Sequence, residues 1–173
     1  MRRASVLLSS LILLAGCRSP KTAYGEKLQY GDFAFVLGEG SSWHGYDVLR
    51  IAATGECWYT FAKLEGDETV WHGAEFTVDE ATLAKLRGEL NEARYFSLQD
   101  RYGDPKVSDG TQRFVKVRVG ENRKSVRCDD ACPPEIVRLS EFVHQTILDP
   151  RVDDFGGAKV IDRAEATEPE SFE

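Results

Sequence analysis

The sequence is short of the residues and spacings that catalysis or metal binding would need. Its 173 residues include only three histidines, and none of them forms an H-E-x-x-H pair with another. The nucleophile elbow of serine hydrolases, G-x-S-x-G, does not occur either. The loop that starts at Asp100 fails the EF-hand pattern for calcium, because Pro105 and Thr111 stand where glycine and glutamate are needed. These absences favour a protein that is not an enzyme and that holds no metal or cofactor.

A surplus of positive charge and a long apolar run are missing as well. The formal net charge is -7, and no basic patch stands out, so nucleic acid is not an expected partner. The longest apolar run, Val6–Ala15, would cover only about 15 Å as a helix, roughly half of the ~30 Å hydrocarbon core of a bilayer. A membrane-spanning anchor is therefore disfavoured.

The first residues, MRRASVLLSSLILLAGC, instead predict export. Arg2 and Arg3 precede the apolar run and small residues follow it, which is the order of a secretory signal peptide. The end of this stretch, Leu14–Cys17, resembles the lipobox of bacterial lipoproteins. The resemblance implies cleavage before Cys17, attachment of diacylglycerol to its sulfur and acylation of the new N-terminus. An ordinary signal peptide with a cysteine nearby is the alternative.

The lipobox would place the protein in the bacterial cell envelope. Two or more acyl chains hold a protein stably on a membrane, so lipid on Cys17 is the expected link to the membrane. Arg18 follows Cys17 where an aspartate could stand. In Gram-negative bacteria this is similar to the pattern of lipoproteins sent to the outer membrane, whose inner leaflet faces the periplasm. Residues 17–29 are polar and without periodicity, and they predict a flexible tether that reaches on the order of 40 Å when stretched.

The rest of the chain predicts one domain and a tail. After a signal peptide at 1–16 and the tether at 17–29, residues 30–150 suffice for a single hydrophobic core. Residues 151–173 are acidic and contain few large apolar side chains, which predicts a mostly disordered tail. The alternative for this tail is partner binding around Val160–Ile161.

Hydrophobic periodicity predicts an α+β fold. Alternation with a period of two marks six strands, and helical spacing marks one helix through Leu83, Leu86 and Leu90 and another opened by Pro133 or Pro134. The order ββββ-α-ββ-α predicts an antiparallel sheet of about six strands packed under two helices in two layers, with the first four strands as a meander. The predicted strands are 32–37, 47–53, 57–64, 68–77, 113–119 and 124–128.

Several local motifs carry a family resemblance. They are GECWY at Gly55–Tyr59, LAKLRGELNEARYFSL at Leu83–Leu98, the loop residues Tyr102 and Asp109–Gly110, and the proline that opens the last helix. Over Phe33–Leu148 the chain resembles a family of bacterial envelope lipoproteins with a domain of unknown function. It is more distantly similar to emfourin, the inhibitor paired with protealysin-type metalloproteases. The resemblance implies the fold more than an activity, and it assigns no inhibitory residue here.

A cluster of aromatic residues is the candidate binding surface. It consists of Trp43, Trp58, Tyr59 and Trp71, and both faces of the strand that holds Trp58 and Tyr59 are apolar. Either the tail, the tether or a loop covers the second face, or that face binds a protein or glycan partner in the envelope.

The stretch RCDDACPPEIV holds two cysteines, Cys128 and Cys132. A zinc site needs about four ligands, and Asp129 and Asp130 should raise the pKa of a nearby thiol and so disfavour a reactive thiolate. The C-x-x-x-C spacing also differs from the usual C-x-x-C of redox pairs. A disulfide between Cys128 and Cys132 that fixes a strand–helix corner is the favoured interpretation. A bond from Cys57 to one of them, or three free thiols, are the alternatives.

The sequence thus favours a lipid-anchored, non-enzymatic binding or scaffolding module. An emfourin-like protease inhibitor is the second hypothesis. An enzyme whose site is assembled from scattered residues is the third.

Overall fold

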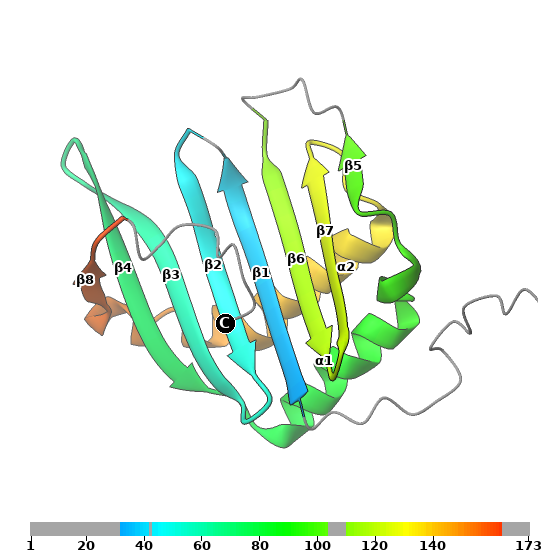
Figure 1. The fold of residues 1–173 in the computed structure, drawn as a ribbon. Coiled ribbons are helices and arrows are strands. Elements are labelled where there is room, and N and C mark those ends of the chain that lie inside the picture. The colour runs from blue at the N-terminus through cyan, green and yellow to red at the C-terminus, as the bar shows by residue number, and fades with distance from the viewer. Residues whose placement is uncertain (1–31, 42, 104–109, 164–173) are drawn as a thin grey trace, which may run out of the picture.

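The computed structural model describes residues 32–41, 43–103 and 110–163. They form one eight-stranded sheet in the order β5-β7-β6-β1-β2-β3-β4-β8. Helices α1 (Glu80–Glu92) and α2 (Pro134–Val143) both lie on one side of this sheet (Figure 1). The α+β class is confirmed, but the sheet has more strands than the expected six.

The first four strands form the predicted meander, in which each strand pairs antiparallel with the next. The hairpin of β6 and β7 does not continue from β4, however. It joins the other side of β1, where Phe35 lies opposite Val117. Helix α1 carries the chain beneath the sheet between these two parts, and β1 therefore becomes a central strand. These strands are β1 (Phe33–Ser41), β2 (Gly45–Ala52), β3 (Glu56–Glu65), β4 (Glu68–Thr77), β6 (Gln112–Val119) and β7 (Asn122–Asp129).

Two short strands complete the sheet at its edges. β5 (Arg101–Gly103) pairs parallel with β7, and β8 (Lys159–Ile161) pairs antiparallel with β4. Both fall in segments that were expected to be a loop and a tail. Three residues are too few to show a periodicity, which explains why the pattern did not reveal them.

The expectation of a disordered tail is wrong for residues 151–163. After α2 the chain continues through a π-helical turn at His144–Leu148 and short 3-10 turns to β8. The Phe155 ring is buried, and its centroid lies 5.2 Å from that of Tyr59 and 5.7 Å from that of Phe61. One aromatic side chain thus docks this segment under β3 and β4, on the same side of the sheet as the helices. The rest of the predicted tail lies outside the described residues.

The hydrophobic core lies between the sheet and the helices. Asp79 caps α1, because its carboxylate accepts a hydrogen bond of 2.8 Å from the backbone N–H of Thr82. Tyr95 is fully buried after α1, and its hydroxyl donates to the backbone oxygen of Val115 at 2.6 Å. Each helix contributes three apolar side chains to this core: Leu83, Leu86 and Leu90 from α1, and Ile136, Leu139 and Val143 from α2.

The described helices are all too short or too polar to cross a membrane. The predicted signal peptide, Cys17 and the tether lie outside the described residues.

Candidate functional site

The face of the sheet that points away from α1 and α2 is here called the open face (Figure 1). Strand register fixes which side chains share it, because residues paired across neighbouring strands point to the same side. One row crosses the sheet as Lys116, Val36, Arg50, Trp58 and Glu75. A neighbouring row holds Arg118, Ala34 and Ala52.

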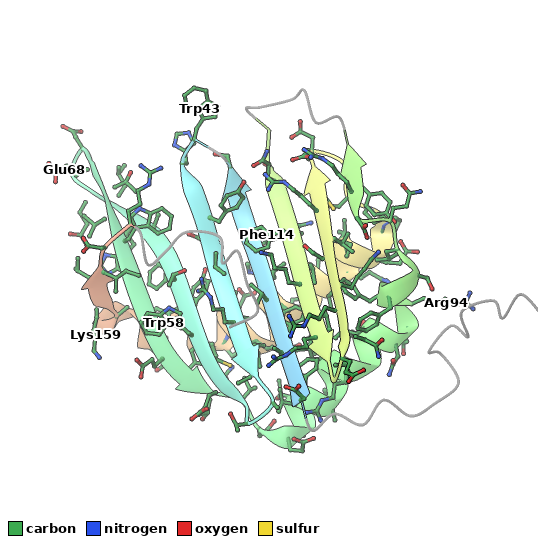
Figure 2. The ribbon with its side chains drawn as sticks, in the orientation of Figure 1. Trp43, Trp58, Glu68, Arg94, Phe114 and Lys159 are labelled. Carbon is green, nitrogen blue, oxygen red and sulfur yellow. The ribbon has the colours of Figure 1, made fainter. Side chains whose placement is uncertain are left out.

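Three aromatic rings of the open face lie directly against strand glycines. A Cβ atom at Gly38 would stand 2.0 Å from the Phe114 ring, and one at Gly45 would stand 2.6 Å from the Trp71 ring. Gly73 lies under Trp58 in the same way, again at 2.6 Å. Glycine at these positions lets each ring rest directly on the backbone. Figure 2 shows Phe114 and Trp58 over the strands.

Beside these rings the open face is hollowed. The hollow has a volume of about 860 Å³, within the usual range for small-molecule sites. Its floor is made of small side chains, including Ala34 and Ala52, and Trp58 stands at one wall. Arg50 and Arg118 also line it, together with the acidic residues Asp32, Glu56 and Glu75.

The cations of the hollow are partly withdrawn from water. Burial lowers the pKa of the Arg50 guanidinium. The Nη2 atom of Arg118 lies 3.1 Å from a carboxylate oxygen of Asp32, while its Nε atom is buried and has no hydrogen-bond partner among the described residues. A partly buried cation is stabilised by neighbouring anions, and the carboxylates of Asp32, Glu56 and Glu75 line the same hollow. The Nε–H of Arg118 remains a donor to which a ligand oxygen could bind.

Charges at the other end of the open face are already matched. Asp129 is buried there, 2.7 Å from Arg101, and it accepts a hydrogen bond of 3.1 Å from Gln112. Arg127 donates to the Tyr46 hydroxyl and to the Gln112 amide oxygen, both at 3.0 Å. This network rigidifies the ends of β2, β6 and β7.

On the side of the helices, Glu39 gathers a second polar cluster. Its carboxylate accepts hydrogen bonds from Ser140 at 2.6 Å, from His144 at 2.5 Å and from Arg113. Burial raises the pKa of Glu39, but the bonds from Ser140 and His144 and the charge of Arg113 outweigh it, so the pKa lies below its usual value. Ser140 donates to Glu39 and not to His144, so the cluster lacks the contact between nucleophile and base that a serine hydrolase needs.

The cysteines lie close to this cluster. Cys128 is buried, Cys132 is partly exposed, and both are free thiols. The Cys128 thiol donates a hydrogen bond to the Cys132 sulfur, which lowers the pKa of Cys132 to about 7 together with Arg113 and against the effect of burial. The same bond and burial raise the pKa of Cys128. The predicted disulfide remains a prediction, and the structure adds that the two sulfurs are in contact. Cys57 is buried apart from them, and burial raises its pKa to about 12.

The predicted aromatic surface is divided by the fold. Trp58 and Trp71 share the open face, where Trp71 is only 5% exposed. Trp43 is 70% exposed and stands at the connection of β1 and β2 (Figure 2). Tyr59 points to the opposite side and packs against Phe155, so its assignment to the surface is wrong. The sequence reading missed the cations Arg50, Lys116 and Arg118, although they alternate with core residues along their strands.

Among the described residues, no group of three or more histidine, cysteine, aspartate or glutamate side chains is placed to hold a metal ion. Comparison of the chain with models of known protein families finds no match, and comparison with curated proteins finds none either. The resemblances to envelope lipoproteins and to emfourin therefore stay predictions.

Proposed function

We propose that the protein is a lipid-anchored module of the bacterial envelope that binds a carboxylate-bearing ligand in the hollow of its open face. The observation that carries this proposal is a hollow of about 860 Å³ on the side of the sheet away from the described helices, where Arg50 and Arg118 stand beside Trp58 and among the carboxylates of Asp32, Glu56 and Glu75. The module binds its ligand and does not transform it.

The lining suggests how such a ligand would be held. Arg50 and Arg118 provide guanidinium groups, which bind carboxylates through paired hydrogen bonds. Lys116 lies opposite Val36 on the next strand, but its ammonium group lies 5.4 Å from the centroid of the Phe114 ring and is not part of the lining. The apolar part of the ligand would rest on the small floor residues and against Trp58.

The anchor is consistent with this site. Asp32, the first described residue, lines the hollow, so the predicted tether joins the domain at its rim. Lipid on Cys17 would hold the hollow within about 40–50 Å of the membrane, the reach of a stretched tether of this length. Ligands of the envelope, including the carboxylate-rich peptidoglycan, fall within that distance.

Calorimetric titration of the mature chain, residues 17–173 with Cys17→Ser, tests the proposal. One arm uses soluble muropeptides, whose carboxylates belong to a glycan-peptide, and the other uses an acidic peptide, whose carboxylates belong to a protein. We expect saturable binding in one arm and at least a tenfold loss of affinity in the double variant Arg50→Gln/Arg118→Gln.

The matched control is Arg138→Gln, which removes an exposed positive charge from α2, on the other side of the sheet. This variant should bind as tightly as the parent. Absence of binding in both arms, or the same loss in the control as in the double variant, would refute the proposal.

A further inference from the structure

The turn between β7 and α2 brings an accessible thiol against a buried one. Cys128 lies on β7 and is 0% exposed, whereas Cys132 is partly exposed and stands shortly before Pro134, the first residue of α2. The backbone N–H of Ala131 donates to the Asp129 oxygen at 2.8 Å and closes the turn. The two sulfurs are in hydrogen-bond contact. This is the arrangement of an attacking thiol and a resolving thiol.

Arg113 places a positive charge beside the accessible thiol. Arg113 is paired with Cys128 across β6 and β7, and its side chain points to the side of the helices. There it is hydrogen-bonded to both the Cys132 sulfur and the Glu39 carboxylate. A neighbouring cation and a nearby helix N-terminus both favour thiolate over thiol. The other titratable groups that face Cys132 are Cys128 and Glu39, and His144 lies behind Glu39.

The expectation that Asp129 disfavours a nearby thiolate holds for Cys128, because the charge of Asp129 raises the pKa of that thiol. Neither aspartate is among the groups that raise the pKa of Cys132. The Asp129 carboxylate is held by Arg101 at 2.7 Å and by Arg127 at 3.3 Å. The Asp130 carboxylate lies against Gly110. The negative charge of Asp129 is thus offset by two arginines, while Arg113 acts on the Cys132 sulfur directly.

We propose that Cys128 and Cys132 form a thiol–disulfide exchange site that acts on a disulfide of a partner protein. This activity is independent of the hollow on the open face. It differs from the predicted structural bridge because the pair would open and close in use. The accessible Cys132 would make first contact with the partner, and Arg113 would act as a positioning residue that stabilises the thiolate.

The exchange proceeds in two displacements. The Cys132 thiolate attacks one sulfur of the partner's disulfide, and the partner's other sulfur leaves as a thiolate that takes the proton of Cys128. The Cys128 thiolate then attacks the Cys132 sulfur, and the second partner sulfur leaves as a thiolate and is protonated by water. The products are a Cys128–Cys132 disulfide and a partner dithiol, so two electrons pass from the pair to the partner. The same steps in reverse oxidise a partner dithiol.

A redox titration tests this proposal first. The mature chain with Cys17→Ser is equilibrated with buffers of reduced and oxidised glutathione, and the two states of the pair are quantified by alkylation and mass spectrometry. We expect the pair to change from oxidised to reduced within the accessible range of buffers. A pair that stays oxidised in all of them is a structural bridge, and a pair that stays reduced has no exchange role; either result overturns the proposal.

Trapping identifies the attacking thiol. Cys128→Ser keeps the attacking group but cannot resolve, so it should accumulate a mixed disulfide with oxidised glutathione at Cys132, whereas Cys132→Ser should accumulate at least tenfold less. Arg113→Gln should slow alkylation of reduced Cys132 at pH 7 about threefold to tenfold, while Arg123→Gln, at an exposed position of β7, should leave the rate unchanged. Trapping at Cys128 instead, or equal rates in the two arginine variants, contradicts the assignment. Circular dichroism confirms that each variant is folded.

Discussion

The two faces of the sheet bury aromatic side chains in different ways. Phe35 is 0% exposed because α1 and α2 cover its side of the sheet. Phe114 is 1% exposed although no helix covers it, since its ring lies on Gly38 and the Tyr46 ring meets it edge to face at 5.3 Å. Low exposure therefore does not by itself identify the core. What covers a residue decides whether it stabilises the fold or shapes a surface.

Truncating one ring on each face tests this difference most directly. Phe35→Ala should lower the free energy of unfolding by about 3–5 kcal/mol, because the helices cannot collapse into the cavity. Phe114→Ala should cost only about 1–3 kcal/mol, because water can enter the space that the ring leaves on the open face. Urea denaturation of both variants measures the two values. Equal losses would mean that the open face is part of the core.

A pair of glycine substitutions sharpens the comparison. Gly38→Ala would force the Phe114 ring off the strand, at a cost of about 1–3 kcal/mol. Gly88→Ala, in α1, meets nothing within 4 Å and should stabilise the protein by about 0.5–1 kcal/mol through helix propensity. The same denaturation measurement applies. Combining Gly38→Ala with Phe114→Ala should recover part of the loss, and strict additivity would show that the ring is not the cause.

On the side of the helices, stability should depend on pH through Glu39. The pKa of Glu39 is lower in the folded state than in the unfolded state, where it lies near 4.5. Its contribution to the free energy of unfolding is therefore present above pH 4.5 and is lost as the pH falls through the pKa of the folded state. Glu39→Gln should cost about 1–2 kcal/mol at pH 7, and the difference from the parent should shrink below about pH 4. Denaturation curves from pH 3 to pH 7 give this difference. The control Glu121→Gln, in the exposed turn after β6, should show the same pH dependence of the free energy of unfolding as the parent. If the difference in stability between Glu39→Gln and the parent stayed constant with pH, Glu39 would not be the source of the pH dependence.

The smallest effect is expected for Arg118→Gln on the open face. Arg118 makes one ion pair with Asp32, which is largely exposed, and such pairs contribute about 0–1 kcal/mol. The free energy of unfolding should therefore change by less than about 0.5 kcal/mol, although we expect ligand affinity to fall. Thermal unfolding and calorimetric binding measure the two quantities. A large loss of stability would show that the hollow serves the fold.

The alternation of apolar residues predicted the strands from β1 to β4, and the spacing of Leu83, Leu86 and Leu90 predicted α1. The pairing of β6 with β1 was not predictable, because it joins segments distant in sequence and both neighbours of β1 present similar apolar faces. Phe155 gave no pattern, since a single aromatic residue among acidic ones has no periodicity. Its burial depends on space under β3 and β4 that only the folded sheet creates.

For the candidate site, alternation along a strand implies that the neighbours Trp58 and Tyr59 point to opposite faces, but it does not say which face the helices cover. Strand glycines were a signal that was available. Gly73 interrupts the predicted strand 68–77, whereas Gly38 follows the predicted strand 32–37 and falls inside β1 only because that strand extends to Ser41. Such glycines mark places where a ring or a backbone approaches closely. Which ring covers which glycine depends on register, and register follows from pairing across the whole sheet.

The two edges of the sheet bear on whether copies of the protein aggregate. Unpaired backbone groups along an edge strand recruit strands from other molecules and so promote aggregation. Here both edges end in strands of three residues, β5 and β8, and β8 begins with the charged Lys159. These short strands cover Trp71–Gly73 of β4 and Arg127–Asp129 of β7, so strand pairing between copies of the protein is disfavoured at these two places along the edges.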